Sequence, residues 1–451
     1  MNQNKLEAKL EKYAKAIEIN NTIANAVYTE NNIKRGLRND NGTGVLVGIT
    51  RVGEVVGYTK ENGVKVPVEG EVYYRGYALS DLVKGFQSEN RLGFEEIVYL
   101  LLFAKLPTKE ELKDFNEILD ASRELPKGYK EDVIIKIPAN NIMNKLQRSV
   151  LTLYSYDPKP DDISVLNVLR QSIDLIAKLP TIAAYGYHAK RHAFHNESLI
   201  LHRPLKGIGT AANLLRMMRL DTKYTQEELE ILDLLLVIQA EHGGGNNSAF
   251  ATHVVSSSGT DTYSAISTAI GALKGPKHGG ANTATTLMMA DIKKHVKDKS
   301  NDEEVRAYLQ KILSKEAYDK KGLIYGLGHA VYTLSDPRTL IIKEKARELA
   351  KHKGRIKDFE LLEKVDRIGC ELINAKVRSD NKVSANVDFY MGLVLSMLNI
   401  PEELTTPLFA VARIAGWSAH RLEQILDDKI MRPAYVNLSE HKDYIDLQNR
   451  D

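Results

Sequence analysis

The sequence predicts an all-α protein with a few short β-strands near its N-terminus. Three observations support this fold class. Apolar residues recur at helical spacing from about residue 80 onward, two capping boxes mark helix starts, and strand-like patterns are confined to residues 44–76. Glycine and proline divide the helical part into segments of roughly 10–20 residues, without a tandem repeat or a low-complexity tract.

The N-terminal region contains the first expected helix and all of the expected strands. Residues 4–30 alternate charged and apolar residues at helical spacing, which predicts one amphipathic helix. A signal peptide is not expected there, because a continuous apolar stretch is missing. Residues 44–76 are rich in valine and are broken by glycine and by an Asn-Gly pair, a pattern that predicts two to four short strands or hairpins.

Two later helix starts are marked by a threonine with a glutamate three residues further on. Thr108 is followed by Glu111, and Thr225 is followed by Glu228. In such a capping box each side chain accepts a hydrogen bond from the other residue's backbone N–H, which satisfies two donors that a helix start leaves free. The sequence therefore predicts helices that begin directly after Thr108 and Thr225.

The composition is that of an ordinary globular protein. Hydrophobic residues make up 43% and charged residues 27%, which is enough apolar material for a sizeable core. A net charge of +3 argues against a dedicated nucleic-acid surface, and the apolar runs are too short to predict a membrane span. Cys370 is the only cysteine, which excludes an intrachain disulfide and a cysteine-based zinc site and favours a reducing compartment.

The charge density along the chain suggests a domain boundary. Residues 291–382 contain more Lys, Glu and Asp than the apolar stretches on either side, 226–290 and 387–417. This difference suggests a smaller and more exposed domain inserted between two parts of a larger one.

His242 begins an HGGG run that allows two interpretations. In α/β hydrolases such a run supplies backbone donors to an oxyanion, but the G-x-S-x-G partner of that site is absent here. The alternative is structural: His242 closes a long helix and Gly243 is the residue that ends it. A helix C-terminus also favours a cationic histidine.

Two further histidines follow glycine-rich turns. His278 lies in GPKHGGAN, directly before a helix expected to start near Ala281, where the helix dipole favours a neutral imidazole. His329 lies in GLGHAVYTLSDPR, nine residues before Arg338 in a rigid Asp-Pro-Arg turn. A guanidinium binds a carboxylate through two parallel hydrogen bonds, so this segment either holds a carboxylated substrate or consists of two unrelated surface loops.

Two charged residues lie at or within apolar helices near the C-terminus. Asp388 precedes a strongly apolar segment, where it is either an N-cap or a partly desolvated carboxylate of raised pKa suited to act as a general base. Arg413 lies inside a nearly all-apolar run from Leu408 to Trp417. A buried arginine needs an anion, which is either an internal acidic residue or a ligand.

His188, His192 and His195 form a cluster that allows a metal-binding hypothesis. The first two are four residues apart and would share a helical face, as metal ligands do. Lys190 and Arg191 add positive charge beside them, which disfavours a metal site.

Taken together, these segments resemble the Si-type citrate synthase family. The resemblance runs through residues 241–433 in unbroken order, and a stretch at 72–82 extends it over most of the chain. Six ordered motifs are far more specific than any one of them. The resembling stretches are VYYRGYALSDL, EHGGGNNSA, GPKHGGAN, GLGHAVYTLSDPR, NVDFYMG, VARIAGWSAH and IMRP.

The resemblance implies a citrate synthase-like two-domain helical fold and an obligate homodimer. Residues 1–281 would form most of a large domain, 282–386 a small mobile acyl-CoA-binding domain, and 387–451 a return to the large domain with a C-terminal arm. The implied activity is an acyl transfer of the tricarboxylic acid cycle, expected in the cytoplasm, that condenses acetyl-CoA with oxaloacetate to give citrate and CoA. The resemblance implies no metal and no cofactor, and we expect no nucleic-acid or membrane partner.

The family's catalytic roles fall on three of the candidate residues. Asp388 resembles the base that removes a methyl proton from the acetyl thioester. His278 resembles the donor to the thioester oxygen, where the enolate charge develops. His329 resembles the residue that hydrogen-bonds the ketone oxygen of oxaloacetate.

Substrate-binding roles fall on a second set. His242, Arg338 and Arg413 resemble the residues that hold the carboxylates of oxaloacetate, and Arg432 resembles an arginine that reaches into the partner subunit's site. Several positions between 323 and 386 resemble contacts of CoA, and nearby basic residues are suited to its phosphates. The CoA set comprises Leu323, Gly326, Gly328 and Asn386, with Lys376, Arg378 and Lys382 as the basic patch.

The chain also departs from the family pattern. Thr283 stands where the family often has Glu, Met391 stands where it often has Ser, and residues 183–202 match no pattern of the family. These differences leave the catalytic set intact but leave the acyl group open, so a 2-methylcitrate synthase that uses propionyl-CoA is the alternative within the family. Outside it, the alternatives are a helical CoA-binding scaffold and a histidine-cluster metalloprotein.

Overall fold

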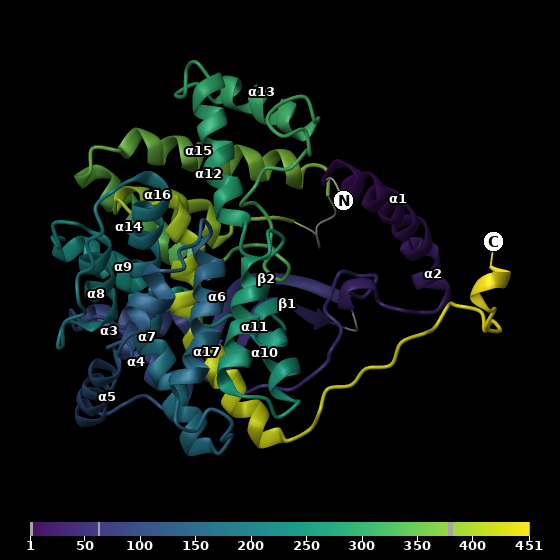
Figure 1. Cartoon of the computed structure of the whole chain (residues 1–451). Helices are drawn as coiled ribbons and strands as arrows, with labels where there is room; N and C mark the ends of the chain where they lie inside the picture. Colours follow the sequence, from purple (N-terminus) through teal and green to yellow (C-terminus); the bar gives the residue numbers. More distant parts are fainter. Residues whose placement is uncertain (1–2, 62–63, 378–381, 451) are drawn as a thin grey trace. The chain divides into compact units, whose positions relative to one another are not determined.

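The computed structural model describes residues 3–61, 64–377 and 382–450 of the chain (Figure 1). The residues group into two compact units, Ile49–Met431 and a smaller unit formed by Met1–Gly48 with Arg432–Asp451. Within the described residues there are seventeen α-helices and one three-stranded sheet, so the predicted all-α class with a few short N-terminal strands is confirmed. Among these residues, none of the helices combines the length and the apolar character needed to cross a bilayer.

The smaller unit contains two short helices where the sequence predicts one. Helix α1 spans Gln3–Asn21 and α2 spans Asn25–Glu30, so the expectation of a single helix over 4–30 was wrong at residues 22–24. The side chains of Asn21 and Thr22 donate to the carbonyls of Ile17 and Glu18. These bonds take acceptors that a continuing helix would use, which ends α1. The unit also contains the 3₁₀ turns η1 (Arg35–Leu37) and η6 (Leu447–Asn449).

The sheet of the larger unit is an antiparallel meander of order β1-β2-β3. Its strands are β1 (Gly53–Glu61), β2 (Val64–Tyr74) and β3 (Tyr77–Ala78). The predicted hairpin between β1 and β2 is confirmed by their pairing, while its tip, residues 62–63, lies outside the described residues.

Two glycines let this sheet approach the segment that follows His329. A side chain at Gly57 would collide with the backbone of Val331, and one at Gly70 would collide with that of Ser335. The Thr333 hydroxyl donates to Gly57 O at 3.0 Å, and Gly70 N–H donates to Ser335 Oγ at 3.1 Å. The N-terminal hairpin therefore supports the loop that carries His329.

The capping boxes predicted the starts of two helices in the larger unit. Both capping boxes, at Thr108 and Thr225, are present with both of their hydrogen bonds. The α-helices are α3 (Leu79–Ser88), α4 (Phe94–Phe103), α5 (Lys109–Ser122), α6 (Ile142–Leu153), α7 (Val165–His195), α8 (Gly209–Met218), α9 (Gln226–Gln239), α10 (Asn247–Ser256), α11 (Thr262–Lys274), α12 (Ala281–His295), α13 (Asp302–Leu313), α14 (Pro337–His352), α15 (Ile356–Asn374), α16 (Val387–Met397) and α17 (Thr405–Asp427). The shorter turns are η2 (Lys130–Ile135, a π-helical turn), η3 (Tyr154–Tyr156) and η5 (Glu402–Leu404).

Helix α17 is the centre of the core. It packs on α4, α7, α9, α10 and α11, and Figure 1 shows it running through the middle of these helices. Trp417 on α17 is fully buried. Burial of a large apolar side chain contributes roughly 1.5–3 kcal/mol, so such contacts hold α17 rigidly in place. A rigid central helix is a suitable support for the polar residues that it carries.

Helices α12 to α16 form a second group. Helix α16 packs on α12 and α14, while α15 packs on α13 and α14. Helices α12 to α15 fall in the stretch 282–386 expected to form the small domain, apart from the first residue of α12, while α16 begins at Val387, where a return to the large domain is expected. The boundaries expected at residues 281 and 386 stay a prediction, because these helices belong to the same compact unit as α3 to α11 and α17.

Candidate active site

The centre of the candidate site is a pair of facing histidines. His242 Nε2 and His329 Nε2 lie 3.0 Å apart, although the residues are 87 positions apart in the sequence. The Tyr332 ring stacks on the His329 ring at 4.5 Å between centroids and lies 5.8 Å from the His242 ring. Burial, aided by the nearby charge of Arg338, lowers the pKa of His242 well below its usual value. His242 is therefore neutral, which excludes the expectation of a cationic histidine at a helix C-terminus.

The backbone after His329 fixes which nitrogen of that ring carries the proton. The N–H groups of Val331 and Tyr332 point at His329 Nδ1 from 3.1 and 3.2 Å. Both groups are donors, so Nδ1 is the acceptor and a neutral ring carries its hydrogen on Nε2. His329 thus presents an Nε2–H donor to the site. His242 Nε2 accepts it here, and the buried His242 Nδ1 has no hydrogen-bond partner among the described residues.

His242 does not end a helix as the structural interpretation expected. Helix α9 ends at Gln239, three residues earlier, and Gly243 lies in the following turn with φ +80°. The HGGG run is therefore a loop between α9 and α10. Glu241 Oε1 accepts from Gly243 N–H within this loop, a bond that holds the turn on which His242 stands.

Arg338 is held by a bidentate ion pair with Asp336. Its Nε and Nη2 donate to the two carboxylate oxygens at 3.0 and 2.7 Å, and both residues are buried. Asp336 also caps α14 by accepting from Arg338 N–H and accepts from Val387 N–H at the start of α16. One carboxylate therefore joins the starts of two helices and aims the guanidinium, which lies 5.6 Å from the centre of the Tyr332 ring.

Asp388 lies in the first turn of α16, two residues after the N-cap. The cap is Asn386, whose side chain accepts from Asp388 N–H, so the interpretation of Asp388 as the N-cap was wrong. The Asp388 carboxyl is partly buried, and desolvation raises its pKa to about 6 against the opposing charge of Arg338. Such a carboxylate is ionised near neutral pH and is a stronger base than an exposed one.

His278 stands in the turn before α12, which begins at Ala281 as predicted. Its Nε2 lies 3.2 Å from Ser248 Oγ, so the Ser248 hydroxyl can donate to it and leave the hydrogen of a neutral ring on Nδ1; the same oxygen accepts the indole N–H of Trp417 at 3.1 Å. This contact fixes the ring and leaves Nδ1 as the nitrogen available to a ligand. Burial and then the charge of Arg413 lower the pKa of His278 to about 4, so the imidazole is neutral in ordinary buffers.

Arg413 is buried on α17, as the sequence predicts, and an internal acid offsets its charge. Its Nε donates to Gln239 O at 2.6 Å. Burial lowers the pKa of Arg413, while the charge of Glu241 opposes this effect. The charge of Arg413 also acts on His242, His278 and Asp388. The histidines, Asp388, Arg338 and Arg413 thus form one electrostatically coupled group.

The glycine-rich segment expected to contact CoA pairs with the segment that leads into α16, through an isolated bridge between Leu327 and Ala385. Gly328 N–H donates to Ser384 O at 2.8 Å, and Asn386 N–H donates to Gly326 O at 2.9 Å. Asn386 Nδ2 donates to Gly328 O at 2.9 Å. Gly326 and Gly328 both have positive φ, and a side chain at Gly326 would collide with Phe389. Glycine is thus required for this close pairing.

The other predicted positions lie at the surface. Leu323, Lys376 and Lys382 are exposed, while Arg378 lies outside the described residues. Arg432 is exposed and belongs to the smaller unit. A cavity of about 560 Å³ lies beside the turn that carries His278. Its walls include Gly279 and Gly280 of that turn as well as Lys321 and Tyr325.

Two of the three histidines of the α7 cluster have separate structural contacts. His188 Nε2 lies 2.8 Å from Met217 O, and His192 Nδ1 lies 2.8 Å from Glu197 O. His195 is the last residue of α7 and is exposed. In both His188 and His192 a ring nitrogen is hydrogen-bonded to a backbone carbonyl, which gives both side chains a structural role.

Sequence reasoning missed the residues that position the site. Asp336, Ser248 and Glu241 hold Arg338, His278 and the His242 turn, respectively. Each sits next to or within a recognised motif, but only the folded chain shows what its side chain touches.

Comparison with known proteins decides the family. Residues 41–434 match the family model described as the C-terminal domain of citrate synthase. The chain belongs to the citrate synthase family. It shares 32% identity with the citrate synthase of Synechocystis sp. over 94% of this chain and 96% of that relative. It shares 32% identity with 2-methylcitrate synthase 1 of Corynebacterium glutamicum over 86% of this chain and 95% of that relative.

A solved structure of this family shares the fold. The citrate synthase of Thermoplasma acidophilum, in a ternary complex with carboxymethyl coenzyme A and oxaloacetate, superposes with a TM-score of 0.74 at 25% identity. The match covers 93% of this chain and 99% of that chain. The resemblance identified from the motifs is thus confirmed over most of the chain, and the protein is an enzyme of the citrate synthase family.

Proposed function

We propose that the enzyme condenses acetyl-CoA with oxaloacetate and hydrolyses the resulting citryl-CoA to citrate and CoA. One observation carries the proposal. A neutral histidine pair with a fixed Nε2–H donor is electrostatically coupled to two buried arginines and to a carboxylate whose pKa is raised to about 6. The two arginines suit a dicarboxylate, and the Nε2–H donor suits a ketone group on it. The carboxylate of raised pKa suits removal of a proton from a weak carbon acid bound beside that dicarboxylate.

The first step of the proposed reaction forms an enolate. The Asp388 carboxylate takes a proton from the methyl group of the thioester, and the C–H electron pair becomes the enolate double bond as charge moves to the thioester oxygen. His278 donates a hydrogen bond from Nδ1 to that oxygen. A neutral donor stabilises the developing charge without protonating it fully.

The second step forms the carbon–carbon bond. The enolate carbon attacks the ketone carbon of oxaloacetate, and the ketone π electrons move to its oxygen. His329 Nε2–H stabilises the charge on that oxygen by a hydrogen bond, and the oxygen is protonated by the proton that Asp388 took in the first step, so both residues return to their starting forms. His242, Arg338 and Arg413 bind the two carboxylates of oxaloacetate. Water then attacks the thioester carbon of citryl-CoA and the C–S bond breaks; one proton of the water leaves on the CoA thiol, and the other is released as the new carboxyl group ionises.

The acyl-CoA binds along the 323–328 and 383–386 segments in this proposal. Gly326 and Gly328 allow the two segments to pair closely, Asn386 joins them, and Lys382 offers its charge to the phosphates of CoA. Metal ions and further cofactors take no part in the proposed chemistry, because protein donors serve every developing charge.

We also propose a homodimer in which Arg432 contributes to the partner subunit's site. Its exposure in the smaller unit is compatible with contact to another subunit. A single cysteine in the chain supports a reducing compartment, and the cytoplasm is the proposed location. The proposed place of the reaction is the tricarboxylic acid cycle.

One experiment tests the proposed substrate pair. Thiol release is measured with acetyl-CoA and with propionyl-CoA, each with and without oxaloacetate. The proposal expects release that depends on oxaloacetate, with a higher kcat/KM for acetyl-CoA. A higher kcat/KM for propionyl-CoA would support the 2-methylcitrate synthase alternative, which the Corynebacterium glutamicum relative represents. Release that does not need oxaloacetate would contradict both.

A further inference from the structure

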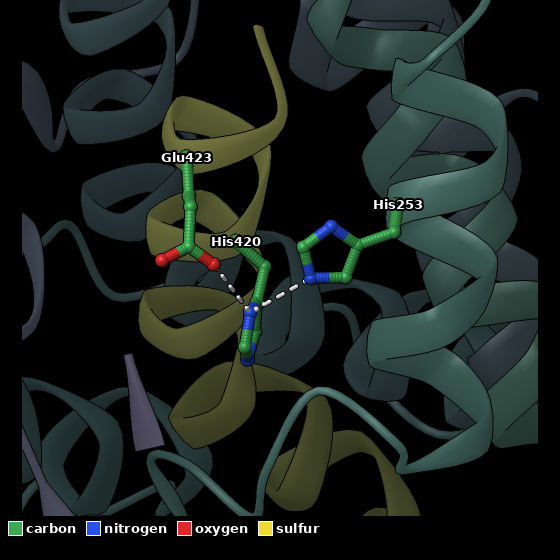
Figure 2. A group of neighbouring side chains, drawn as sticks. All are labelled: His253, His420 and Glu423. Carbon is green, nitrogen blue, oxygen red and sulfur yellow. Dashed lines mark hydrogen bonds and ion pairs between the residues drawn. The ribbon is translucent and has the colours of Figure 1, made fainter. Parts of the chain in front are cut away.

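A buried histidine on α17, His420, contacts the residue that precedes His242. Its Nε2 lies 3.0 Å from Glu241 Oε1, and its Nδ1 lies 3.0 Å from His253 Nε2. Figure 2 shows the two imidazoles meeting edge to edge, with Glu423 approaching His420 from one turn further along the same helix. His420 and Glu241 are almost completely buried.

The partners of these side chains fix the positions of the protons. His253 Nδ1 faces Gln424 Oε1 at 2.9 Å. The Gln424 amide nitrogen faces two acceptors, Asp427 Oδ2 and Lys429 O, which assigns its oxygen to the His253 side. His253 therefore donates from Nδ1, and in a neutral ring its Nε2 is an acceptor. Burial, together with the charge of His420, lowers the pKa of His253, which favours this neutral form.

His420 is left to donate from both of its nitrogens. On one side it faces the acceptor nitrogen of His253, and on the other it faces Glu241 Oε1, which already accepts from Gly243 N–H. A ring that donates from both nitrogens is an imidazolium. Burial opposes ionisation of Glu241, but the charge and the hydrogen bond of His420 outweigh burial and lower the pKa of Glu241.

Other charged side chains surround the pair formed by His420 and Glu241. Glu423 Oε2 lies 4.0 Å from His420 Nδ1 and has no hydrogen-bond partner among the described residues. Its Oε1 accepts from Arg51 N–H. The charge of Arg75 acts on both Glu423 and Glu241, and that of Arg413 acts on Glu241. The imidazolium thus lies between two carboxylates, one on each side.

We propose that His420, as an imidazolium, is a positioning residue that holds Glu241 and through it presents His242 and Arg413 to oxaloacetate. Glu241 binds the backbone of the His242 turn and offsets the charge of Arg413. Glycines enclose it, since a side chain at Gly53 or Gly416 would collide with its carboxylate. Glu241 therefore has no room to turn, and the bond to His420 sets its orientation.

A divalent cation is the competing explanation for this cluster. One ligand atom from each of His253, His420 and Glu423 lies within 4.8 Å of the others. The outer bonds to Glu241 and Gln424 are also of the kind that orient metal-bound histidines. The 3.0 Å separation of the two inner nitrogens is a normal hydrogen-bond length, so one proton satisfies both rings without a metal.

Paired substitutions of His420 test the proposal, which rests on oxaloacetate being the substrate. His420→Gln places an amide nitrogen near the position of Nε2 and can keep the bond to Glu241, whereas His420→Asn places it near Nδ1 and loses that bond. We expect His420→Asn to raise the KM for oxaloacetate by about tenfold or more, as loss of a charged hydrogen bond predicts. The KM for acetyl-CoA should change by less than about threefold, and His420→Gln should recover most of the loss.

His188→Gln is the matched control, because His188 is a buried histidine bonded to a backbone carbonyl on α7. It should lower the thermal midpoint without changing either KM. If His420→Asn does not fold, Glu241→Gln keeps the shape of the carboxylate and should raise the oxaloacetate KM in the same way.

Two results would overturn the proposal. One is an unchanged oxaloacetate KM in His420→Asn or Glu241→Gln while the wild type is active. The other is one equivalent of a divalent metal in the purified wild type that His253→Gln loses, which would make the cluster a cation site. An inactive wild type would instead contradict the proposed function. Failure of the role proposed for His420 can therefore be told apart from failure of the proposed function.

Discussion

Asp388 combines partial burial with the charges of Arg338 and Asp336, and desolvation is the larger effect on its carboxyl. Because its pKa is raised to about 6, the carboxylate protonates as the pH falls through 6 and the base is lost. His278, whose pKa is lowered to about 4, stays neutral over the same range. We expect kcat/KM for acetyl-CoA to rise about tenfold per pH unit below 6 and to level off above it. A pH profile that is flat between 5 and 7 would contradict the assignment of Asp388 as base.

Ser248 lies between the His278 imidazole and the Trp417 indole. Replacing it with alanine removes the contact that fixes His278 Nε2 and leaves Nδ1 less well oriented toward the thioester oxygen. We expect Ser248→Ala to lower kcat by about ten- to a hundredfold with little change in the KM for oxaloacetate, because the affected interaction belongs to the transition state. Steady-state kinetics with both substrates measures this, and a change confined to the oxaloacetate KM would argue against the role of His278. Thr268→Ala is a control, since the Thr268 hydroxyl donates to a carbonyl of its own helix, α11.

At the scale of elements, one carboxylate connects the starts of α14 and α16. Asp336 caps α14, pairs with Arg338 and accepts from Val387 N–H. Asp336→Ala leaves a buried guanidinium without its partner, which costs about 3–5 kcal/mol of unfolding free energy. The same substitution should raise the oxaloacetate KM, because Arg338 loses its orientation.

The control for this prediction is a helix cap without an ion pair. Asn301 caps α13 through Glu303 and Glu304 N–H, so Asn301→Ala should cost about 1 kcal/mol and leave both KM values unchanged. Urea unfolding of the two variants measures the difference. Equal costs for both variants would show that Asp336 is only a cap.

Local signals predicted the elements well wherever a short stretch of sequence contains the whole cause. The capping boxes at Thr108 and Thr225 and the start of α12 at Ala281 are examples. The prediction failed at residues 22–24, where Asn21 and Thr22 bond back to the preceding turn, and at the end of α9, three residues before His242. Such boundaries depend on competing hydrogen bonds that periodicity does not register.

The candidate site was predictable in its reactive groups but not in its supports. The sequence brought forward His242, His278, His329, Asp388 and two arginines because they recur in recognisable motifs. It gave no reason to connect Asp336 with α16 or Glu241 with His420, since these contacts join segments 51 and 179 residues apart. Long-range partners of this kind are decided by packing and not by spacing.

At the scale of the whole molecule, the proposed dimer makes a prediction about mixed subunits. If Arg432 acts in the partner's site, a heterodimer of Arg432→Ala and Asp388→Asn subunits contains one intact site and one site with both defects. Random mixing should then recover about a quarter of wild-type activity from two inactive variants. Each variant alone and the unmixed pair serve as controls, and no recovery after verified subunit exchange would place Arg432 in its own subunit's site.

If Asp388 is the base of an oxaloacetate-dependent condensation, replacing its carboxylate should slow thiol release from acetyl-CoA. The rate is measured with and without oxaloacetate for the wild type, for Asp388→Asn, and for Asp157→Asn, a control that removes a carboxylate bonded to Arg170 and Tyr263. We predict that release requires oxaloacetate, that Asp388→Asn lowers kcat by about a hundredfold or more with little change in KM, and that Asp157→Asn retains the wild-type rate. Wild-type kcat in Asp388→Asn, or release without oxaloacetate, would contradict the claim.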